Sequence, residues 1–184
     1  MKIAVICGSS RSRGNSEALV ERVLKDLDAE WIFLRDHHIL PIVDKRHDEE
    51  GFKPVDDDYH DVITRIMRHD ILLFVTPLYW YGMSGFMKNF IDRWSHSLRD
   101  TRYDFKSAMN GKIAYVVICG GDRARVKGLP LVQQFQYIFD FMSMRFGGFL
   151  IGEGSRPGDV LRDGRALKEA EWLNVELKQR VSQQ

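Results

Sequence analysis

Short, continuous apolar runs alternate along the chain with longer segments whose apolar residues recur every three or four positions. Continuous apolar runs are typical of strands that are buried on both faces of a parallel sheet. Five such runs predict strands at residues 2–7, 29–34, 70–76, 112–119 and 148–152. Helical spacing of apolar residues predicts helices at residues 19–27, 59–66, 86–94, 131–142 and 167–181.

Five strands alternating with five helices predict an α/β fold with a parallel sheet and helices on both faces. The expected strand order is 2-1-3-4-5 in a doubly wound sheet. No repeat, low-complexity segment or linker divides the sequence, so we expect residues 1–184 to form a single domain. Ligands of such sheets bind at the carboxyl ends of the strands, where the order reverses. The loops after strands one, three and four should therefore meet at one site.

Composition and charge narrow the classes of partner. Lys plus Arg number 27 and Asp plus Glu 26, which leaves a formal charge of +1 on 184 residues. This balance gives no electrostatic reason to expect binding to nucleic acid or to an anionic membrane. No apolar run approaches the ~18 residues of a membrane-spanning helix. The two cysteines make no disulfide framework, so we expect a reducing, cytoplasmic setting.

The loop after the first strand, CGSSRSRGNSEAL at residues 7–19, has the composition of an anion site. Its glycines permit unusual backbone conformations, and the following helix directs free N–H groups and its positive dipole end toward the loop. Arginines can add charge-assisted hydrogen bonds to phosphate. Small polar residues also form plain turns before helices, so the loop by itself leaves both interpretations open. The candidate anion-binding residues are Ser9, Ser10, Arg11, Gly14, Asn15 and Ser16.

Cys7 and Arg13 also satisfy C-x5-R, the spacing of a cysteine phosphatase loop. Cys7 would then be a thiolate nucleophile at a helix N-terminus, and Arg13 would hold the phosphoryl oxygens. Low-molecular-weight tyrosine phosphatases, which have such a loop, place Ser or Thr after the arginine and take an acid from an Asp-Pro loop. Here Gly14 follows the arginine, and none of the five prolines follows an Asp. We therefore interpret Cys7 as a small apolar residue that ends a buried strand.

The loop after the third strand, within TPLYWYGMSGFMKNFIDRW at residues 76–94, is the most specific stretch of the chain. The consecutive Tyr79, Trp80 and Tyr81 cannot all point into one core, so at least one should face a cleft or a partner. Gly82 lets the backbone approach a flat ligand closely. A planar, partly polar heterocycle suits such a wall, and so does a subunit interface, because Tyr and Trp favour both.

GSSRSRGNS at residues 8–16 and TPLYWYGMSGFMKNFIDRW together resemble the NADPH-dependent FMN reductase branch of the flavodoxin-like flavoproteins. LIGEGSRPGDVLRD at residues 150–163 is similar to the end region of several members. The resemblance covers most of the chain and implies a flavodoxin-like fold. It implies that the FMN phosphate is held by Ser9, Arg11, Asn15 and Ser16. It implies that the isoalloxazine ring is bordered by Pro77, Leu78, Tyr79, Trp80 and Gly82, and that a third flavin loop contains Gly120 and Gly121.

The resemblance also implies a function. Such an enzyme passes hydride from NADPH or NADH through bound FMN to a small acceptor, such as a quinone, an azo or nitro compound, or a flavin. The cofactor carries the chemistry, so we expect no side chain to act as a catalytic acid or base. A flavodoxin-type electron carrier without NAD(P)H turnover is the alternative, although the near-neutral charge does not favour an acidic docking surface. No sequence feature demands a regulatory binding module. The aromatic wall favours a homodimer or a higher homo-oligomer.

Residues 35–58 are irregular, charged and rich in His and Asp, and they contain no cysteine. Iron–sulfur flavoproteins, which are among the proteins that this chain resembles, carry closely spaced cysteines between the second strand and the second helix. An iron–sulfur cluster is therefore unsupported. The histidines fit no recognised metal-ligand spacing, so we expect a solvated, mobile loop and no metal site.

Overall fold

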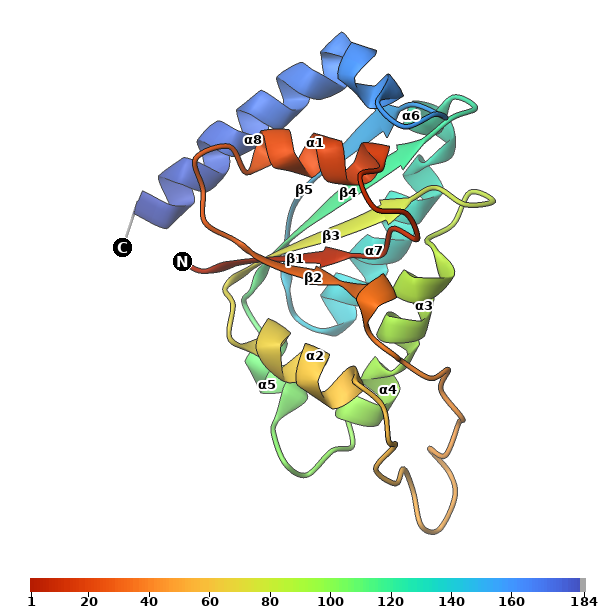
Figure 1. Cartoon of the computed structure of the whole chain (residues 1–184). Coiled ribbons are helices and arrows are strands. Elements are labelled where there is room, and N and C mark those ends of the chain that lie inside the picture. The colour runs from red at the N-terminus through yellow and green to blue at the C-terminus, as the bar shows by residue number, and fades with distance from the viewer. Residues whose placement is uncertain (183–184) are drawn as a thin grey trace.

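A computed structural model describes residues 1–182. Its strands are β1 (Ile3–Cys7), β2 (Glu30–Phe33), β3 (Ile71–Pro77), β4 (Ile113–Gly120) and β5 (Arg145–Glu153). They form one sheet in the order β2-β1-β3-β4-β5, and every neighbouring pair is parallel. The predicted flavodoxin-like sheet is confirmed (Figure 1).

Helices cover both faces of the sheet (Figure 1). One face packs against α1 (Asn15–Val23) and α8 (Gly164–Ser182). The other face packs against α2 (Tyr59–Met67), α3 (Gly85–Asp92), α4 (Trp94–Ser97), α5 (Phe105–Met109) and α7 (Leu129–Phe141). The connections contain α6 (Ala124–Lys127) and two 3-10 turns, η1 (Leu34–Asp36) and η2 (Asp159–Arg162).

Strand side chains alternate between the two helical layers. Val5 and Val117 belong to the cluster beneath α1 and α8, whereas Ile6 and Val116 belong to the cluster on the opposite face. All four side chains are completely buried. Because both faces of the sheet are covered, each strand is apolar at successive positions, and the sequence shows unbroken apolar runs instead of alternation.

Several boundaries differ from the sequence-based prediction. Helix α1 ends at Val23 and does not continue to Leu27, because Asp26 adopts a left-handed backbone with φ 59° in the following turn. Strand β5 begins at Arg145, before the predicted residue 148, and its register shifts near Gly148. Glycine is a weak strand former, which hides the start of this strand in the sequence. The four- and five-residue helices α4, α5 and α6 are too short to show a period.

The connection between η1 and α2, residues 37–58, leaves the body of the molecule as a long irregular loop and returns to it (Figure 1). Arg93, which is only 2% exposed, closes the base of this loop. Its Nη1 donates to the Leu40 carbonyl at 3.1 Å and to the Asp57 carboxylate. Its guanidinium also lies 4.5 Å from the centre of the Tyr59 ring. One buried cation thus joins the start and the end of the loop to the end of α3.

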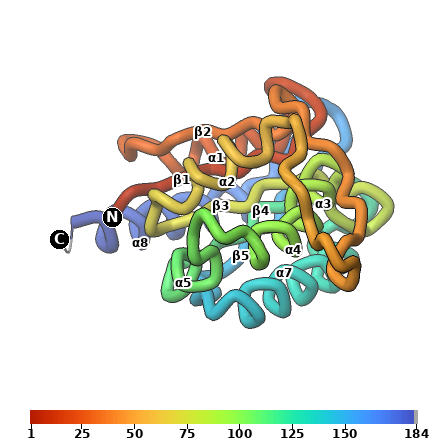
Figure 2. Tube along the Cα trace, turned by 90° about the horizontal axis from the view of Figure 1, so that it is seen from below, coloured from red at the N-terminus to blue at the C-terminus, as the bar shows by residue number. Residues whose placement is uncertain are grey.

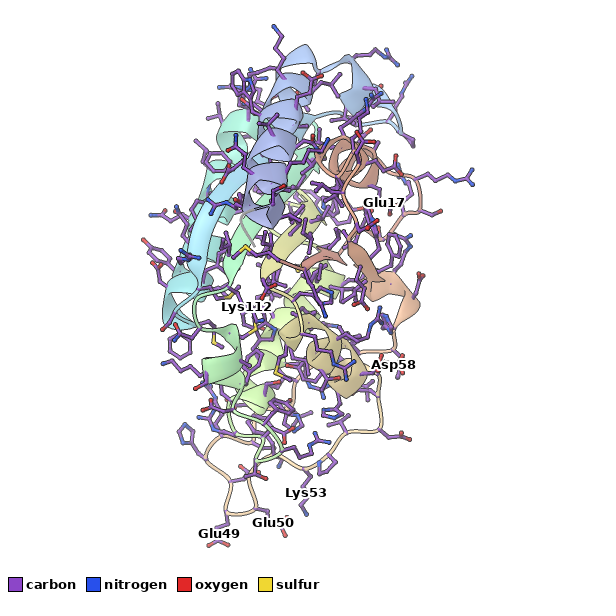
Figure 3. All side chains as sticks on the ribbon, turned by 90° about the vertical axis from the view of Figure 1, so that its left-hand side faces the viewer. Glu17, Glu49, Glu50, Lys53, Asp58 and Lys112 are labelled. Carbon is purple, nitrogen blue, oxygen red and sulfur yellow. The ribbon has the colours of Figure 1, made fainter. Side chains whose placement is uncertain are left out.

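The far end of this loop carries charged side chains that extend away from the body (Figure 3). The labelled ones are Glu49, Glu50 and Lys53. Within residues 1–182, no group of three His, Cys, Asp or Glu side chains is placed to hold a metal ion. In the same part of the chain, no helix is both long enough and apolar enough to cross a membrane.

We expect Asp57→Ala to lower the free energy of unfolding by about 3–5 kcal/mol, because it leaves the buried Arg93 guanidinium without its counter-charge. Burial alone would raise the pKa of Asp57, but hydrogen bonds from Arg93 and from the backbone hold this pKa below its ordinary value. The contribution of the carboxylate is therefore fully present above the unfolded-state pKa of ~3.9 and is lost as the pH falls through the lower folded-state pKa.

Denaturant unfolding at pH 7 and at acidic pH measures the stability lost in Asp57→Ala and how this loss depends on pH. The exposed neighbour Asp56 provides the matched control, since Asp56→Ala should change the free energy of unfolding by less than about 0.5 kcal/mol. Equal effects of the two substitutions at pH 7 would contradict the role given to the Asp57–Arg93 pair.

Candidate functional site

The loops after β1, β3 and β4 lie at the same end of the sheet, its carboxyl edge (Figure 2). They border a cavity of about 260 Å³. The predicted site residues that line it are Ser9, Arg11, Gly14, Asn15, Ser16, Pro77, Leu78, Tyr79, Gly120 and Gly121. The other four predicted residues belong to the same loops without lining the cavity: Ser10, Trp80, Tyr81 and Gly82. A larger cavity of about 680 Å³ lies under the 37–58 loop, but no residue of the sheet edge lines it.

Helix α1 begins at the cavity without a side-chain cap. Its N-cap residue is Gly14, in an extended conformation, and within residues 1–182 no side chain takes over the capping role. The first N–H groups of a helix have no partner inside the helix. Because Gly14, Asn15 and Ser16 all line the cavity, these N–H groups and the positive end of the helix dipole border it. This arrangement is suited to an anion.

A fourth loop, which follows β5, reaches the cavity through Gly154 and Ser155. This segment lies within the stretch that resembles flavoproteins, but neither residue is among the predicted site residues. A Cβ on Gly121 would lie 2.3 Å from Ser155 Oγ, and a Cβ on Gly154 would lie 2.9 Å from Asn15 Nδ2. The two glycines therefore allow the loops to approach each other. In the sequence, the adjacent glycines Gly120 and Gly121 after β4 are the signal that could have indicated this close approach.

The amide of Asn15 joins the loop after β1 to the loop after β5. Asn15 Nδ2 donates to the Arg156 carbonyl at 2.9 Å, and Asn15 Oδ1 accepts from the Val160 N–H at 3.4 Å. Both polar ends of this side chain are therefore engaged within the protein. The Asn15 side chain therefore connects the two loops, and its backbone N–H is the group that remains available at the cavity.

The aromatic loop reverses direction in a tight turn. Tyr79 and Gly82 exchange two backbone hydrogen bonds of 3.0 Å. The two residues between them, Trp80 and Tyr81, have φ values of 49° and 65°, a left-handed conformation that is uncommon for residues other than glycine. All three aromatic side chains are exposed, and Trp80 is 96% exposed. None of the three is part of the core, and Tyr79 borders the cavity; a contact of Trp80 or Tyr81 with a partner stays a prediction.

Side-chain hydrogen bonds connect the aromatic turn to the loops on either side. The Tyr79 hydroxyl lies 2.9 Å from Ser10 Oγ. The Tyr81 hydroxyl donates to Asp122 Oδ2 at 2.6 Å, and Lys127 Nζ lies 2.6 Å from the same oxygen. Lys127 and then Tyr81 lower the pKa of Asp122 through these bonds. The three loops are therefore linked to one another around the cavity.

Cys7 lies at the end of β1 and is completely buried. Its Sγ is 3.9 Å from Glu17 Oε1. Burial, to which the nearby carboxylate adds, raises the pKa of Cys7 to about 11. A cysteine phosphatase needs a thiolate near neutral pH. The structure therefore argues against the alternative in which Cys7 and Arg13 form a phosphatase loop.

We expect a thiol reagent such as DTNB to label neither cysteine of the native protein at pH 8. Burial raises the pKa of Cys119 to about 12, so that both thiols are protonated as well as inaccessible. Absorbance should report two reactive thiols after unfolding and none before. In Cys119→Ser the remaining thiol is Cys7, and rapid labelling of this native variant would contradict the raised pKa.

Known proteins resemble this chain over most of its length. A family model described as NADPH-dependent FMN reductase matches residues 1–154. A putative NAD(P)H-dependent FMN-containing oxidoreductase of Bacillus subtilis is 55% identical over 174 residues, which are 94% of this chain and 96% of that protein. The solved structure of a Trp repressor binding protein from Bacillus subtilis has a TM-score of 0.80 and 48% identity, covering 94% of this chain and 97% of that one. An iron–sulfur flavoprotein of Methanocaldococcus jannaschii is 27% identical, covering 98% of this chain and 97% of that protein.

Proposed function

The chain belongs to the family of NADPH-dependent FMN reductases, and we propose that it transfers two electrons from NAD(P)H to a small planar acceptor through FMN bound at the carboxyl edge of the sheet. FMN supplies the redox chemistry when it is bound, and the protein binds and orients it. The observation that carries this proposal is the position of the uncapped α1 N-terminus, which borders the same cavity as the aromatic turn.

We assign the FMN phosphate to the loop after β1. The uncapped N–H groups of α1 can donate to phosphate oxygens, and Arg11 also lines the cavity. Ser9 Oγ donates to the Arg11 carbonyl at 3.0 Å, so this hydroxyl helps to shape the loop. An anion held in this way is retained as part of a cofactor, because the neutral Cys7 thiol is no nucleophile.

We assign the isoalloxazine ring to the space between the aromatic turn and the loops after β4 and β5. Tyr79 lines this space, and Gly120 and Gly121 bring backbone groups to its edge. A cavity of about 260 Å³ is slightly below the roughly 300–1,000 Å³ of most ligand pockets, so it encloses only part of the cofactor. The outer face of the ring would remain accessible to NAD(P)H and then to a quinone, an azo or nitro compound, or a flavin.

The residues that line the cavity support a mechanism without a side-chain acid or base. None of the described residues that line it is a His, Asp or Glu. The Cys119 thiol, whose pKa is raised to about 12 by burial, is also unsuited to exchange a proton at neutral pH. The role of the protein is therefore to hold the phosphate, to place the ring and to leave one face open.

Reduction of bound flavin tests the proposal. We expect the purified protein to be yellow, to bleach when NADPH or NADH is added without oxygen, and to regain its colour when a quinone, an azo dye or a nitroaromatic compound follows. The relative reoxidation rates identify the preferred class of acceptor. Free FMN at the same concentration is the control and should react with NAD(P)H far more slowly. A yellow protein that neither nicotinamide bleaches would support the electron-carrier alternative, and a protein that takes up no FMN would refute both.

We also propose that the chain forms a homodimer or a higher homo-oligomer in which Trp80 contacts a second copy. This side chain is 96% exposed and does not line the cavity, so it is accessible to a second copy. Large exposed aromatic side chains are typical of subunit interfaces.

Sedimentation velocity should show a dimer or larger species for the native chain and a smaller species for Trp80→Ala. Trp172 on α8 is 71% exposed and offers a matched control, since Trp172→Ala should leave the mass unchanged. A monomeric native protein would contradict the proposal.

A further inference from the structure

We infer that Glu17 and Arg35 are positioning residues for the cofactor phosphate, although neither of them lines the cavity. Their ion pair holds the loop after β1 in its binding conformation and cancels a buried negative charge close to the anion site. The inference rests on the proposed location of the FMN phosphate and concerns the residues that make this location suitable.

Glu17 lies in the first turn of α1 and is only 7% exposed (Figure 3). Its Oε2 accepts a hydrogen bond of 2.9 Å from the backbone N–H of Arg13. Arg13 has a φ of 54°, which places it in the strained left-handed region immediately before the N-cap residue Gly14. The carboxylate reaches back from the third helical position, much as in a capping box. Glu17 thereby stabilises the unusual backbone that leads into the helix.

Arg35 reaches the same loop from η1, directly after β2. Its Nη1 lies 2.5 Å from Glu17 Oε1 and also points to the carbonyl oxygens of Ser9 and Arg11, at 3.4 and 3.3 Å. The two carbonyl contacts are long for hydrogen bonds, so the ion pair is the stronger interaction. The Arg35 guanidinium stacks on the Phe33 ring, with its central carbon 4.4 Å from the ring centre. The Arg35 side chain is 16% exposed. One cation thus contacts two residues whose side chains or backbone line the cavity.

The charge of Arg35 has an effect beyond geometry. Glu17 is a buried carboxylate within one helical turn of the uncapped N–H groups, and like charges repel strongly where water is largely excluded. An unpaired Glu17 would therefore oppose phosphate binding, whereas the ion pair with Arg35 removes most of this repulsion. Loss of Arg35 should weaken phosphate binding in two ways. The loop after β1 becomes less ordered, and the negative charge of Glu17 is left unpaired. Neutralising Glu17 as well should relieve the second effect.

Comparing FMN with riboflavin, which lacks the phosphate, isolates this contribution. The Kd of FMN can be measured from the flavin fluorescence that appears when the holoprotein is diluted, and riboflavin can be titrated into the full-length chain after FMN is removed. We expect Arg35→Met to weaken FMN binding roughly 10–100-fold, as for loss of a charge-assisted interaction, and to change riboflavin binding less than about 2-fold. The double variant Glu17→Gln/Arg35→Met should bind FMN more tightly than Arg35→Met alone.

Two further variants keep the test decisive. Arg22→Met makes the same substitution at the exposed, opposite end of α1 and should leave both affinities unchanged. Arg35→Lys retains the charge but lacks the planar guanidinium that stacks on the Phe33 ring. It should therefore weaken FMN several-fold without affecting riboflavin, even if Arg35→Met does not fold.

The inference is wrong if Arg35 variants bind FMN like the native chain, if FMN and riboflavin lose affinity equally, or if the double variant is no tighter than Arg35→Met. Failure of the native protein to bind FMN would instead contradict the proposed function. Equal affinity of the native protein for FMN and riboflavin would contradict the proposed phosphate location.

Discussion

The pairing of β1 with β3 sets the position from which the rest of the site is built. Cys7 pairs with Val75, and the Gly8 N–H extends the ladder by one bond to the Val75 carbonyl at 2.8 Å. The Gly8 carbonyl then accepts a 2.5 Å hydrogen bond from Ser84 Oγ, the N-cap of α3. A Cβ on Gly8 would lie 2.9 Å from Ser84 Oγ. The close approach of β1 to α3 therefore fixes where the following loop leaves the sheet.

From this fixed point, the loop after β1 is held by polar contacts on both sides. Ser84 binds it from α3, and the ion pair of Glu17 with Arg35 binds it from α1 and β2. A loop that is ordered before its ligand arrives loses less conformational entropy on binding. Buried polar groups stabilise such an arrangement only when they are mutually satisfied, because an unpaired one costs more than the bond it could form. The Glu17–Arg35 ion pair therefore both orders the loop and neutralises the carboxylate next to it.

Sequence reasoning succeeded where the signal is local and failed where a contact depends on three-dimensional register. Apolar runs and periodic helices predicted the sheet, and the expected strand order predicted that the small polar loop and the aromatic loop meet at its carboxyl edge. Ser155 escaped notice because only the pairing of β4 with β5 brings it to Gly121. Arg35 looked like an ordinary surface charge, since nothing in the sequence places the end of β2 beside a loop twenty-odd positions earlier. The spacing C-x5-R does not show whether Cys7 is a nucleophile or a buried strand residue, because that depends on how deeply the thiol is buried.

The contacts that join the two ends of the 37–58 loop have a consequence for how the length of this loop can vary. Arg93 holds the loop where it departs, at the Leu40 carbonyl, and where it returns, at Asp57. The entropy of closing a loop grows only slowly with its length. Insertions or deletions at the exposed end of this loop should therefore cost little stability, and no residue of the loop lines the cavity at the sheet edge. The length of the loop is therefore nearly independent of the geometry at the carboxyl edge of the sheet.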